Sequence, residues 1–326
     1  MAAIIESLSK WRARRADRLA RGKSSGLSRR ETRLGLLFLS PWIIGLLAFY
    51  LIPMGASLVF SFTKFQLGTG AATEGLRFVG FNNYLQLFRD PQVRKALSIT
   101  LRFMLFALPV GVAWPVLLAL MLNAKNLWAK QLFRTLYYLP YIVPVVSVAY
   151  IWQGFLNTRT GWLNRFLETL SIPGPEWLNS TTWIYPALIL VGLWGVGDAL
   201  IRTLAGLQNV PKEFYEAARV DGAGWFRMFW GITVPMVSPM IFYNALLLVI
   251  GLFQYFTLAW ILGGPNSNPS EATLFYNVYL YKQAFVYSNM GYGSTLAWVL
   301  FLLALVVTIV LFGTQKYWVY YAAEEG

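Results

Sequence analysis

Residues 213–235 of the chain read EFYEAARVDGAGWFRMFWGITVP, and they lie between two long apolar stretches. This segment gathers two glutamates, an aspartate, two arginines and three glycines, although the whole chain is 57% hydrophobic and only 13% charged. Ordinary soluble domains carry about 25% charged residues. The composition therefore indicates a membrane protein in which a polar segment connects two spans.

Six uncharged stretches are long enough to cross a bilayer, which takes about 20 apolar residues. They cover residues 34–63, 103–124, 135–158, 177–197, 228–270 and 283–315. The fifth is too long for one helix, and its prolines and glycines predict a membrane part at roughly 238–262. The last helix is expected to begin near Gly291. The sequence thus predicts an all-α, polytopic membrane protein with six transmembrane helices.

Basic residues gather at the N-terminal end, where ten of the 27 Lys and Arg residues lie within residues 1–33. A net charge of +13 spread over a soluble face would suggest nucleic acid, but beside a span it is typical of a cytoplasmic tail that orients the chain in the lipid bilayer. We therefore expect no nucleic-acid partner and both termini in the cytoplasm. The expected parts are a basic tail 1–33, a transmembrane domain 34–315 containing a cytoplasmic loop at about 208–235, and a C-terminal tail 316–326.

The chain contains no cysteine and no histidine. Thiolate and imidazole metal sites, Cys and His nucleophiles and histidine proton relays are therefore excluded. The acidic residues do not cluster, which also disfavours an integral membrane enzyme. We expect no catalytic residues, no metal site and no enzymatic activity in this chain.

The polar segment is open to two interpretations. Glu216 can pair with Lys212 and Arg219 on one helix, which would make the segment a solvated linker. Alternatively, a helix that stops at the glycine-rich turn 221–224 and a second short helix after it form a compact knob. Glu216 would then be available to a basic group on a cytoplasmic partner. The residues alone leave both interpretations open.

The spacing inside the segment carries a family resemblance. Glu216-Ala217-Ala218 is followed by Gly222, Ile232 and Pro235 at intervals of six, ten and three residues. This pattern resembles the EAA loop of binding-protein-dependent ABC transporter permeases, and NVPKEFYEAARVDGA is similar to its form in carbohydrate-uptake permeases. The resemblance covers about residues 34–320, including SPWIIGLLAFYLIPMGASLVFSFTKF, FVGFNNYLQLFRD, LPYIVPVVSVAYIW, FQYFTLAWILGGP and LFYNVYLYKQAF.

Two positions depart from the family pattern. Val234 stands where a leucine is usual before the last proline of the loop, and Leu262 runs directly into Gly263, where the family commonly has an additional Thr-Gly. The second departure affects the geometry expected for the outer loop.

The resemblance implies the type I ABC importer permease fold in the cytoplasmic (inner) membrane of a prokaryote. It implies ATP-driven import, by alternating access, of a mono- or oligosaccharide or a related polyol or glycoside. The implied partners are a second homologous permease subunit, two ATP-binding cassette subunits and an extracytoplasmic sugar-binding protein. ATP and Mg would be held by the ATPase subunits and no cofactor by this chain. The implied ATPase-coupling residues are Glu216, Ala217, Ala218, Asp221, Gly222, Ile232 and Pro235.

Asp198 is an ionisable residue inside the predicted fourth span. Such a residue costs about 2.5–3.5 kcal/mol on insertion scales and is therefore a functional candidate. Asp198 can pair with Arg202 one turn on, or it can accept sugar hydroxyls beside Trp194 and Gly195. These three positions resemble sugar contacts of the maltose-type permease, in which an aromatic residue replaces the aspartate, so a different specificity is expected.

The fifth span offers a second group of substrate-path candidates. Gln254 places an amide within an apolar helix, where it needs a hydrogen-bonding partner that a polyhydroxylated ligand can supply. Tyr255 and Thr257 lie nearby, although an aromatic stripe in a membrane helix is more often packed or lipid-facing than ligand-binding.

The alternative from another class is an ion-coupled secondary transporter. Six spans without an internal repeat and a single intramembrane carboxylate stand against it. Purification with co-eluting ATPase subunits would favour the ABC importer over this alternative.

Overall fold

The computed structural model describes residues 30–66, 76–124 and 127–321. In this part of the chain the secondary structure is almost wholly helical, with one antiparallel pair of short strands, β1 (Thr63–Lys64) and β2 (Arg77–Phe78). The chain divides into two units, residues 1–59 and 60–326. Most of the predicted basic tail 1–33, and residues 322–326 of the C-terminal tail, lie outside the described residues.

The first unit holds most of the helix Arg30–Ser61, in which an 18-residue stretch has a mean hydropathy of 2.2, as suits a membrane span. A π-helical turn, η1 (Leu47–Leu51), precedes α2 (Ile52–Ser61), which has Pro53 as its second residue. Proline has no N–H for the carbonyl four residues back, and a π turn is one of the usual ways in which a helix continues past such a defect. The helix agrees closely with the predicted span at 34–63.

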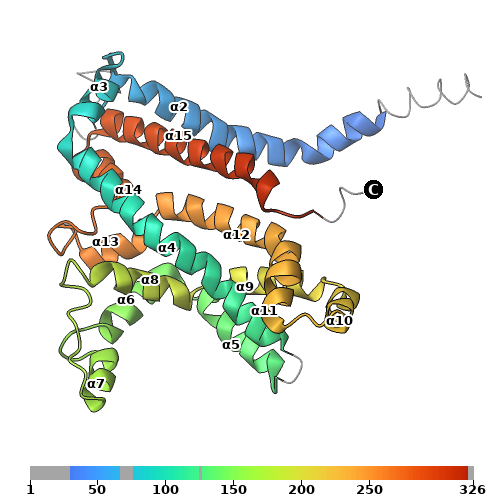
Figure 1. Ribbon diagram of the computed structural model, residues 1–326. Coiled ribbons are helices and arrows are strands. Elements are labelled where there is room, and N and C mark those ends of the chain that lie inside the picture. The colour runs from blue at the N-terminus through green and yellow to red at the C-terminus, as the bar shows by residue number, and fades with distance from the viewer. Residues whose placement is uncertain (1–29, 67–75, 125–126, 322–326) are drawn as a thin grey trace, which may run out of the picture. The chain divides into compact units, whose positions relative to one another are not determined.

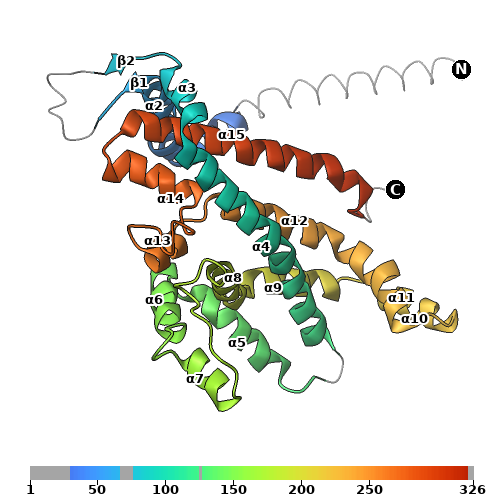
Figure 2. The same cartoon turned by 60° about the vertical axis from the view of Figure 1, so that its left-hand side comes forward.

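The second unit is built around α4 (Pro91–Asn123), which runs through its centre (Figures 1 and 2). It packs against α8 (Ile184–Trp194), α9 (Gly197–Gln208) and α12 (Val234–Phe253). At about 1.5 Å per residue, a helix of this length exceeds the roughly 30 Å of a hydrocarbon core. The uncharged run at 103–124 therefore identified the membrane part of α4 but missed the charged turns before it.

Two predicted spans are bent pairs of helices. α5 (Lys130–Ile142) and α6 (Val145–Phe155) meet at 102°, and α8 and α9 meet at 56°. Pro144 stands before α6, where its ring disfavours helical backbone in the preceding residue. With each bent pair counted as one span, the described residues contain six candidate spans, as predicted.

The fifth span differs from the prediction at both ends. α11 (Trp225–Met228), the π-helical turn η2 (Phe229–Thr233) and α12 form one helix from Trp225 to Phe253. The chain then breaks and continues as the separate helix α13 (Thr257–Gly263). The helix therefore starts well before Pro235 and ends before Gln254, and the predicted range 238–262 is divided between α12 and α13.

The sixth span, α15 (Met290–Thr314), begins where the sequence predicted, beside Gly291. The remaining elements are short. Between the spans lie α3 (Asn82–Arg89), α7 (Trp162–Thr169), α10 (Lys212–Val220), α14 (Tyr276–Tyr281) and η3 (Lys282–Val286), and η4 (Gln315–Tyr317) follows α15.

A carboxylate ties three of these helices together at the start of α4. Asp90 caps α4 by accepting from the Gln92 N–H at 2.9 Å, and its other oxygen accepts from the hydroxyls of Tyr279 on α14 at 2.5 Å and Tyr292 on α15 at 2.9 Å. Burial, together with the hydrogen bond to Asp90, raises the pKa of Tyr279, which therefore stays a proton donor. This cluster fixes the end of the core made by α4, α12, α14 and α15.

Candidate functional site

A cavity of about 350 Å³ lies among α4, α8, α9 and α12. Its wall is mostly apolar, which is usual for ligand sites that use a few placed polar groups for orientation. Among the described residues the polar side chains on the wall are those of Asp198, Arg202, Asn244, Tyr141 and Tyr255.

The break between α8 and α9 sets the position of the cavity's charged groups. Gly195 and Val196 separate the two helices, so that Asp198 lies in the first turn of α9, where the helix dipole favours an anion. Gly197 also lets α5 come close, because a Cβ at this position would lie 2.7 Å from the Tyr137 carbonyl oxygen. The fourth span is therefore not the single helix that the sequence suggested.

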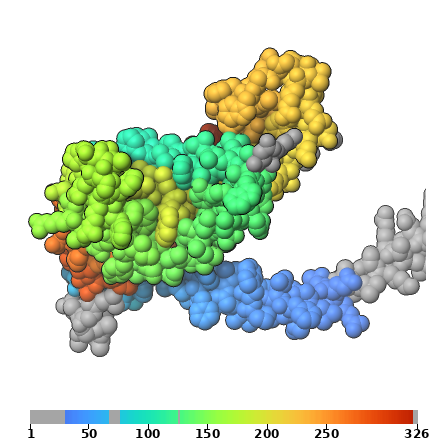
Figure 3. Space-filling model, turned by 90° about the horizontal axis from the view of Figure 1, so that it is seen from below, coloured from blue at the N-terminus to red at the C-terminus, as the bar shows by residue number. Residues whose placement is uncertain are grey.

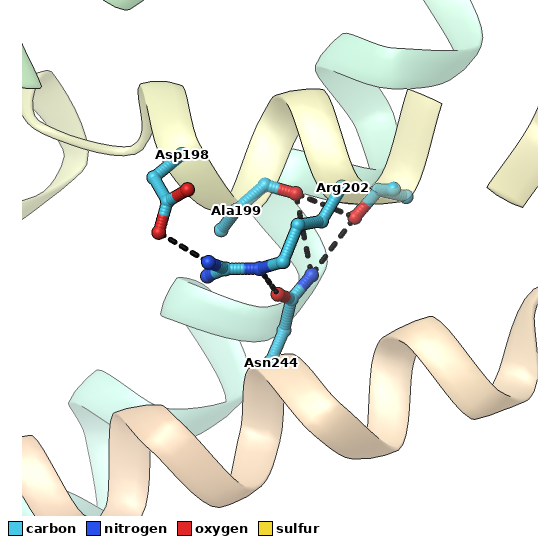
Figure 4. A network of polar contacts seen from close by, with 5 residues as sticks. Asp198, Ala199, Arg202 and Asn244 are labelled. Carbon is cyan, nitrogen blue, oxygen red and sulfur yellow. Dashed lines mark hydrogen bonds and ion pairs between the residues drawn. The ribbon is translucent and has the colours of Figure 1, made fainter. Parts of the chain in front are cut away.

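Asp198 and Arg202 form an ion pair one turn apart on α9 (Figure 4). The Arg202 Nε also donates to the Asn244 Oδ1 at 2.8 Å, which joins α9 to α12. The Asn244 amide in turn donates to the Thr203 hydroxyl at 2.9 Å and to the Ala199 carbonyl at 3.3 Å. Of the two interpretations of Asp198, the pair with Arg202 is present, and both side chains still line the cavity.

Tyr255 forms another polar part of the wall. Its ring packs against Phe103 and Phe275, with centroids 5.0 Å apart in each case. Its buried hydroxyl has no hydrogen-bond partner in the described part of the chain. Because an unsatisfied buried hydroxyl costs about 1–3 kcal/mol, this group is available to a ligand that reaches it.

The six substrate-path candidates separate into two groups. Gly195, Asp198 and Tyr255 lie on the cavity wall, whereas Trp194, Gln254 and Thr257 do not. The Trp194 ring packs against Trp152 instead, with centroids 6.0 Å apart.

The remaining two candidates follow the break after α12. Gln254 is exposed there, and its backbone carbonyl accepts from the Asn277 side-chain amide at 3.2 Å, while Thr257 begins α13. Asn244 was missed by the sequence analysis. An amide within an apolar helix was the reason for choosing Gln254, but Asn244 is the residue that lies within α12.

The polar loop between the fourth and fifth spans projects from the body of the second unit (yellow to orange in Figure 3). After α10 the chain reverses at Gly222, whose φ of +74° is accessible to glycine with little strain. Backbone bonds from Gly222 N–H to the Arg219 carbonyl and from Ala223 N–H to the Ala218 carbonyl close the turn. The predicted pair of helices joined by a glycine turn is present.

The coupling candidates lie on two sides of this loop. Glu216, Ala217, Asp221 and Gly222 are exposed, and Ala218 is half-buried. No ion pair among the described residues involves Glu216, so the proposed pairing with Lys212 and Arg219 is not present.

Two further coupling candidates face the body of the protein. Ile232 packs against the apolar core between α4, α9 and α12, and Pro235 stands in the first turn of α12. A hydrogen bond of 3.0 Å between the Tyr215 and Thr233 hydroxyls links α10 to the start of the fifth span.

A polytopic helical protein with bent spans, a cavity among them and a projecting polar loop has the features of a membrane transport subunit. The chain belongs to the family of binding-protein-dependent transport system inner membrane components, whose model matches residues 111–319. Membership in this family excludes the alternative of an ion-coupled secondary transporter. The relatives are transport subunits rather than enzymes.

Curated relatives match almost the whole chain. A probable ABC transporter permease, YesP of Bacillus subtilis, is 36% identical over 93% of this chain and 97% of its own length. The arabinooligosaccharide permease AraP of the same organism is 32% identical, covering 84% and 86%, and the lactose permease LacF of Rhizobium radiobacter is 30% identical, covering 94% and 99%.

A solved structure confirms the fold. A chain of a bacterial alginate ABC transporter, crystallised with an alginate pentasaccharide-bound periplasmic protein, superposes with a TM-score of 0.76. The match covers 88% of this chain and 95% of that chain at 24% sequence identity. The architecture is thus that of ABC importer permeases.

Proposed function

We propose that this chain is one of two homologous permease subunits of an ATP-driven importer that moves a mono- or oligosaccharide, or a related polyol or glycoside, into the cytoplasm by alternating access. Two ATP-binding cassette subunits supply the ATP and Mg sites, and an extracytoplasmic sugar-binding protein delivers the substrate. The complex lies in the inner membrane of a prokaryote, with both termini of this chain in the cytoplasm.

The observation that carries this proposal is the continuous helix from Trp225 to Phe253. Its first turn follows the exposed loop directly, and its middle contributes Asn244 and Leu247 to the cavity wall. A rigid helix of this kind transmits a displacement of the loop to the cavity. Domain closure by an ATPase bound at the loop would thereby alter access to the substrate.

The cavity suits a saccharide because it offers several polar groups of modest strength on an apolar wall. Asp198 and Arg202 can accept from and donate to hydroxyls, and the unpartnered Tyr255 hydroxyl can bind another. A site with several weak contacts fits transport, since the substrate must leave as readily as it enters. Relatives named for arabinooligosaccharides and for lactose support this class of substrate.

The loop suits a docking role because Glu216, Ala217 and Gly222 are exposed on its surface. The Glu216 carboxylate makes no ion pair among the described residues, and the exposed Ala217 beside it permits close approach. Gly222 has nothing within 4 Å of the position that a Cβ would occupy. Substitutions at the exposed Glu216 and Ala217 therefore report on the partner, whereas a side chain at Gly222 also strains the backbone at φ +74°.

Two substitutions in the complete complex test the assignment of roles. Glu216→Lys should lower transport at least tenfold while membrane insertion is unchanged, because a reversed charge faces the ATPase. Asp198→Asn should change the apparent saccharide affinity while the ATPase subunits still co-purify. Glu168→Lys, on the exposed part of α7, is the matched charge reversal and should leave ATPase co-purification unchanged. Wild-type transport by Glu216→Lys, or loss of the ATPase subunits from Asp198→Asn, would contradict these roles.

A further inference from the structure

The cavity wall carries one cation and one anion among its described lining residues, Arg202 and Asp198, and they are paired with each other. The wall is therefore electrically neutral. The Arg202 side chain is 27% exposed and the Asp198 side chain 36%, so the pair is accessible from the cavity yet largely removed from solvent. In such surroundings a charge that loses its partner is costly.

The guanidinium of Arg202 is held in one orientation. Its Nε donates to the Asn244 Oδ1 at 2.8 Å, and its centre lies 5.4 Å from the centroid of the Tyr243 ring. Asn244 is itself held by Thr203 at 2.9 Å. Arg202 therefore cannot turn away from Asp198 toward a ligand without breaking the contacts that join α9 to α12.

The pair leaves one carboxylate oxygen and one terminal guanidinium nitrogen without a protein partner in the described part of the chain. These are the second carboxylate oxygen of Asp198, Oδ1, and the second terminal nitrogen of Arg202, Nη2. A sugar hydroxyl is both a donor and an acceptor, so it can donate to Oδ1 and accept from Nη2 without disturbing the pair. Two neighbouring hydroxyls can divide these bonds between them.

A substrate carboxylate, unlike a hydroxyl, cannot bind beside this pair without disturbing it. To reach Arg202 it must stand beside the Asp198 carboxylate, where the like charges repel, or displace Asp198 and leave that anion unpaired. No other Lys or Arg among the described lining residues compensates the added charge. The arrangement favours hydroxyls and disfavours carboxylates at the same place.

We propose that the Asp198–Arg202 pair restricts the import path to uncharged saccharide residues and that Asp198 is the residue that excludes uronates. This inference rests on the proposed function. It predicts that Asp198→Asn, which keeps the size of the side chain and removes its charge, leaves Arg202 as an uncompensated cation. The variant should then accept a sugar carboxylate.

The test is equilibrium binding to the complete complex in lipid nanodiscs, without the extracytoplasmic binding protein, which would otherwise select the sugar first. Two pairs of radiolabelled probes are used: α-1,4-linked galactobiose with digalacturonate of the same linkage, and cellobiose with its uronate counterpart. Within each pair the members differ in whether C6 carries a hydroxyl or a carboxylate.

We expect the native complex to bind the uncharged member of a pair at least tenfold more tightly than the acidic member. In Asp198→Asn this ratio should fall at least tenfold, and binding of the acidic probe should weaken as salt is added, because it depends on Arg202. Glu168→Gln removes one negative charge from the exposed part of α7, outside the cavity, and should keep the native ratio.

Two failures are distinguishable. Equal or tighter binding of the uronate probe by the native complex, or an unchanged ratio in Asp198→Asn, would overturn the exclusion of uronates and leave the saccharide site in place. No binding of any of the four probes by native complex and variant alike would overturn the cavity as a saccharide site, and with it the proposed function.

Discussion

Replacing Gly197 with alanine tests whether the close packing of α5 against α9 positions the charged wall of the cavity. Gly197 is buried at the start of α9, and an added Cβ would lie 2.7 Å from both the Tyr137 carbonyl oxygen and the Tyr138 Cα. Both are backbone atoms, which cannot move aside as a flexible side chain can. The two helices must therefore separate, and Asp198, the next residue, moves with α9.

The size of the effect follows from two opposing contributions. Overpacking a tight contact costs about 1–3 kcal/mol. Alanine in place of glycine within a helix stabilises the folded state by up to about 1 kcal/mol. Gly154→Ala is the matched control, because Gly154 also lies near a helix end but has nothing within 4 Å of its Cβ position. The difference between the two variants isolates the contact, at about 1–3 kcal/mol.

The assay is denaturant unfolding of the full chain in detergent micelles, followed by saccharide affinity in the complete complex. Gly197→Ala should unfold at lower denaturant than Gly154→Ala and should bind saccharide more weakly, since Asp198 and Arg202 shift relative to Asn244. Equal free energies of unfolding for the two variants would refute the claim that this contact is tight. Lower stability with unchanged affinity would refute the claim that it positions the cavity wall.

Three further substitutions test other contacts by the same unfolding measurement. Asp90→Ala should cost about 2–4 kcal/mol, because two buried phenol hydroxyls and the first turn of α4 lose their acceptor; a loss below about 0.5 kcal/mol would contradict this role. Asn244→Leu should cost about 2–3 kcal/mol, since the Nε of Arg202 loses its acceptor, and a neutral result would show that α9 and α12 are not joined by this amide. Tyr215→Phe should cost about 0.5–1.5 kcal/mol through the lost bond to Thr233 and should reduce ATP-dependent uptake; unchanged uptake would exclude α10 as the element that moves the fifth span.

The number of spans follows from apolar length, because hydrocarbon thickness sets a minimum that charge-free runs reveal. Their limits follow less well: the fourth span was predicted at 177–197, whereas the bent pair of α8 and α9 runs from Ile184 to Gln208. Their internal breaks do not follow in the same way. Pro235 was expected to interrupt the fifth helix, but it lies in the first turn of α12 after a π-helical turn in which the Val234 N–H bonds to the Phe229 carbonyl, five residues back. Proline is tolerated in such a place, and the sequence does not distinguish it from a break.

The cavity was predicted less completely than the loop. The spacing of Glu216, Gly222, Ile232 and Pro235 lies along a few consecutive turns, so sequence order preserves it. The cavity joins four helices, and whether Gln254 or Asn244 faces it depends on where α12 ends. The break at Gly195 and Val196 places Asp198 in the first turn of a new helix, which apolar length alone does not predict.

The most direct test of the account is uptake of a labelled saccharide into vesicles that hold the complete complex, with the binding protein outside and ATP inside. Native complex should accumulate the saccharide only when ATP is enclosed. Gly222→Asp should abolish accumulation while the protein remains inserted, because its Cβ position has no neighbour within 4 Å among the described residues, so the substitution acts at the partner surface or through the backbone at φ +74°. Accumulation without ATP, or native uptake by Gly222→Asp, would contradict an ATP-driven permease that is coupled through this loop.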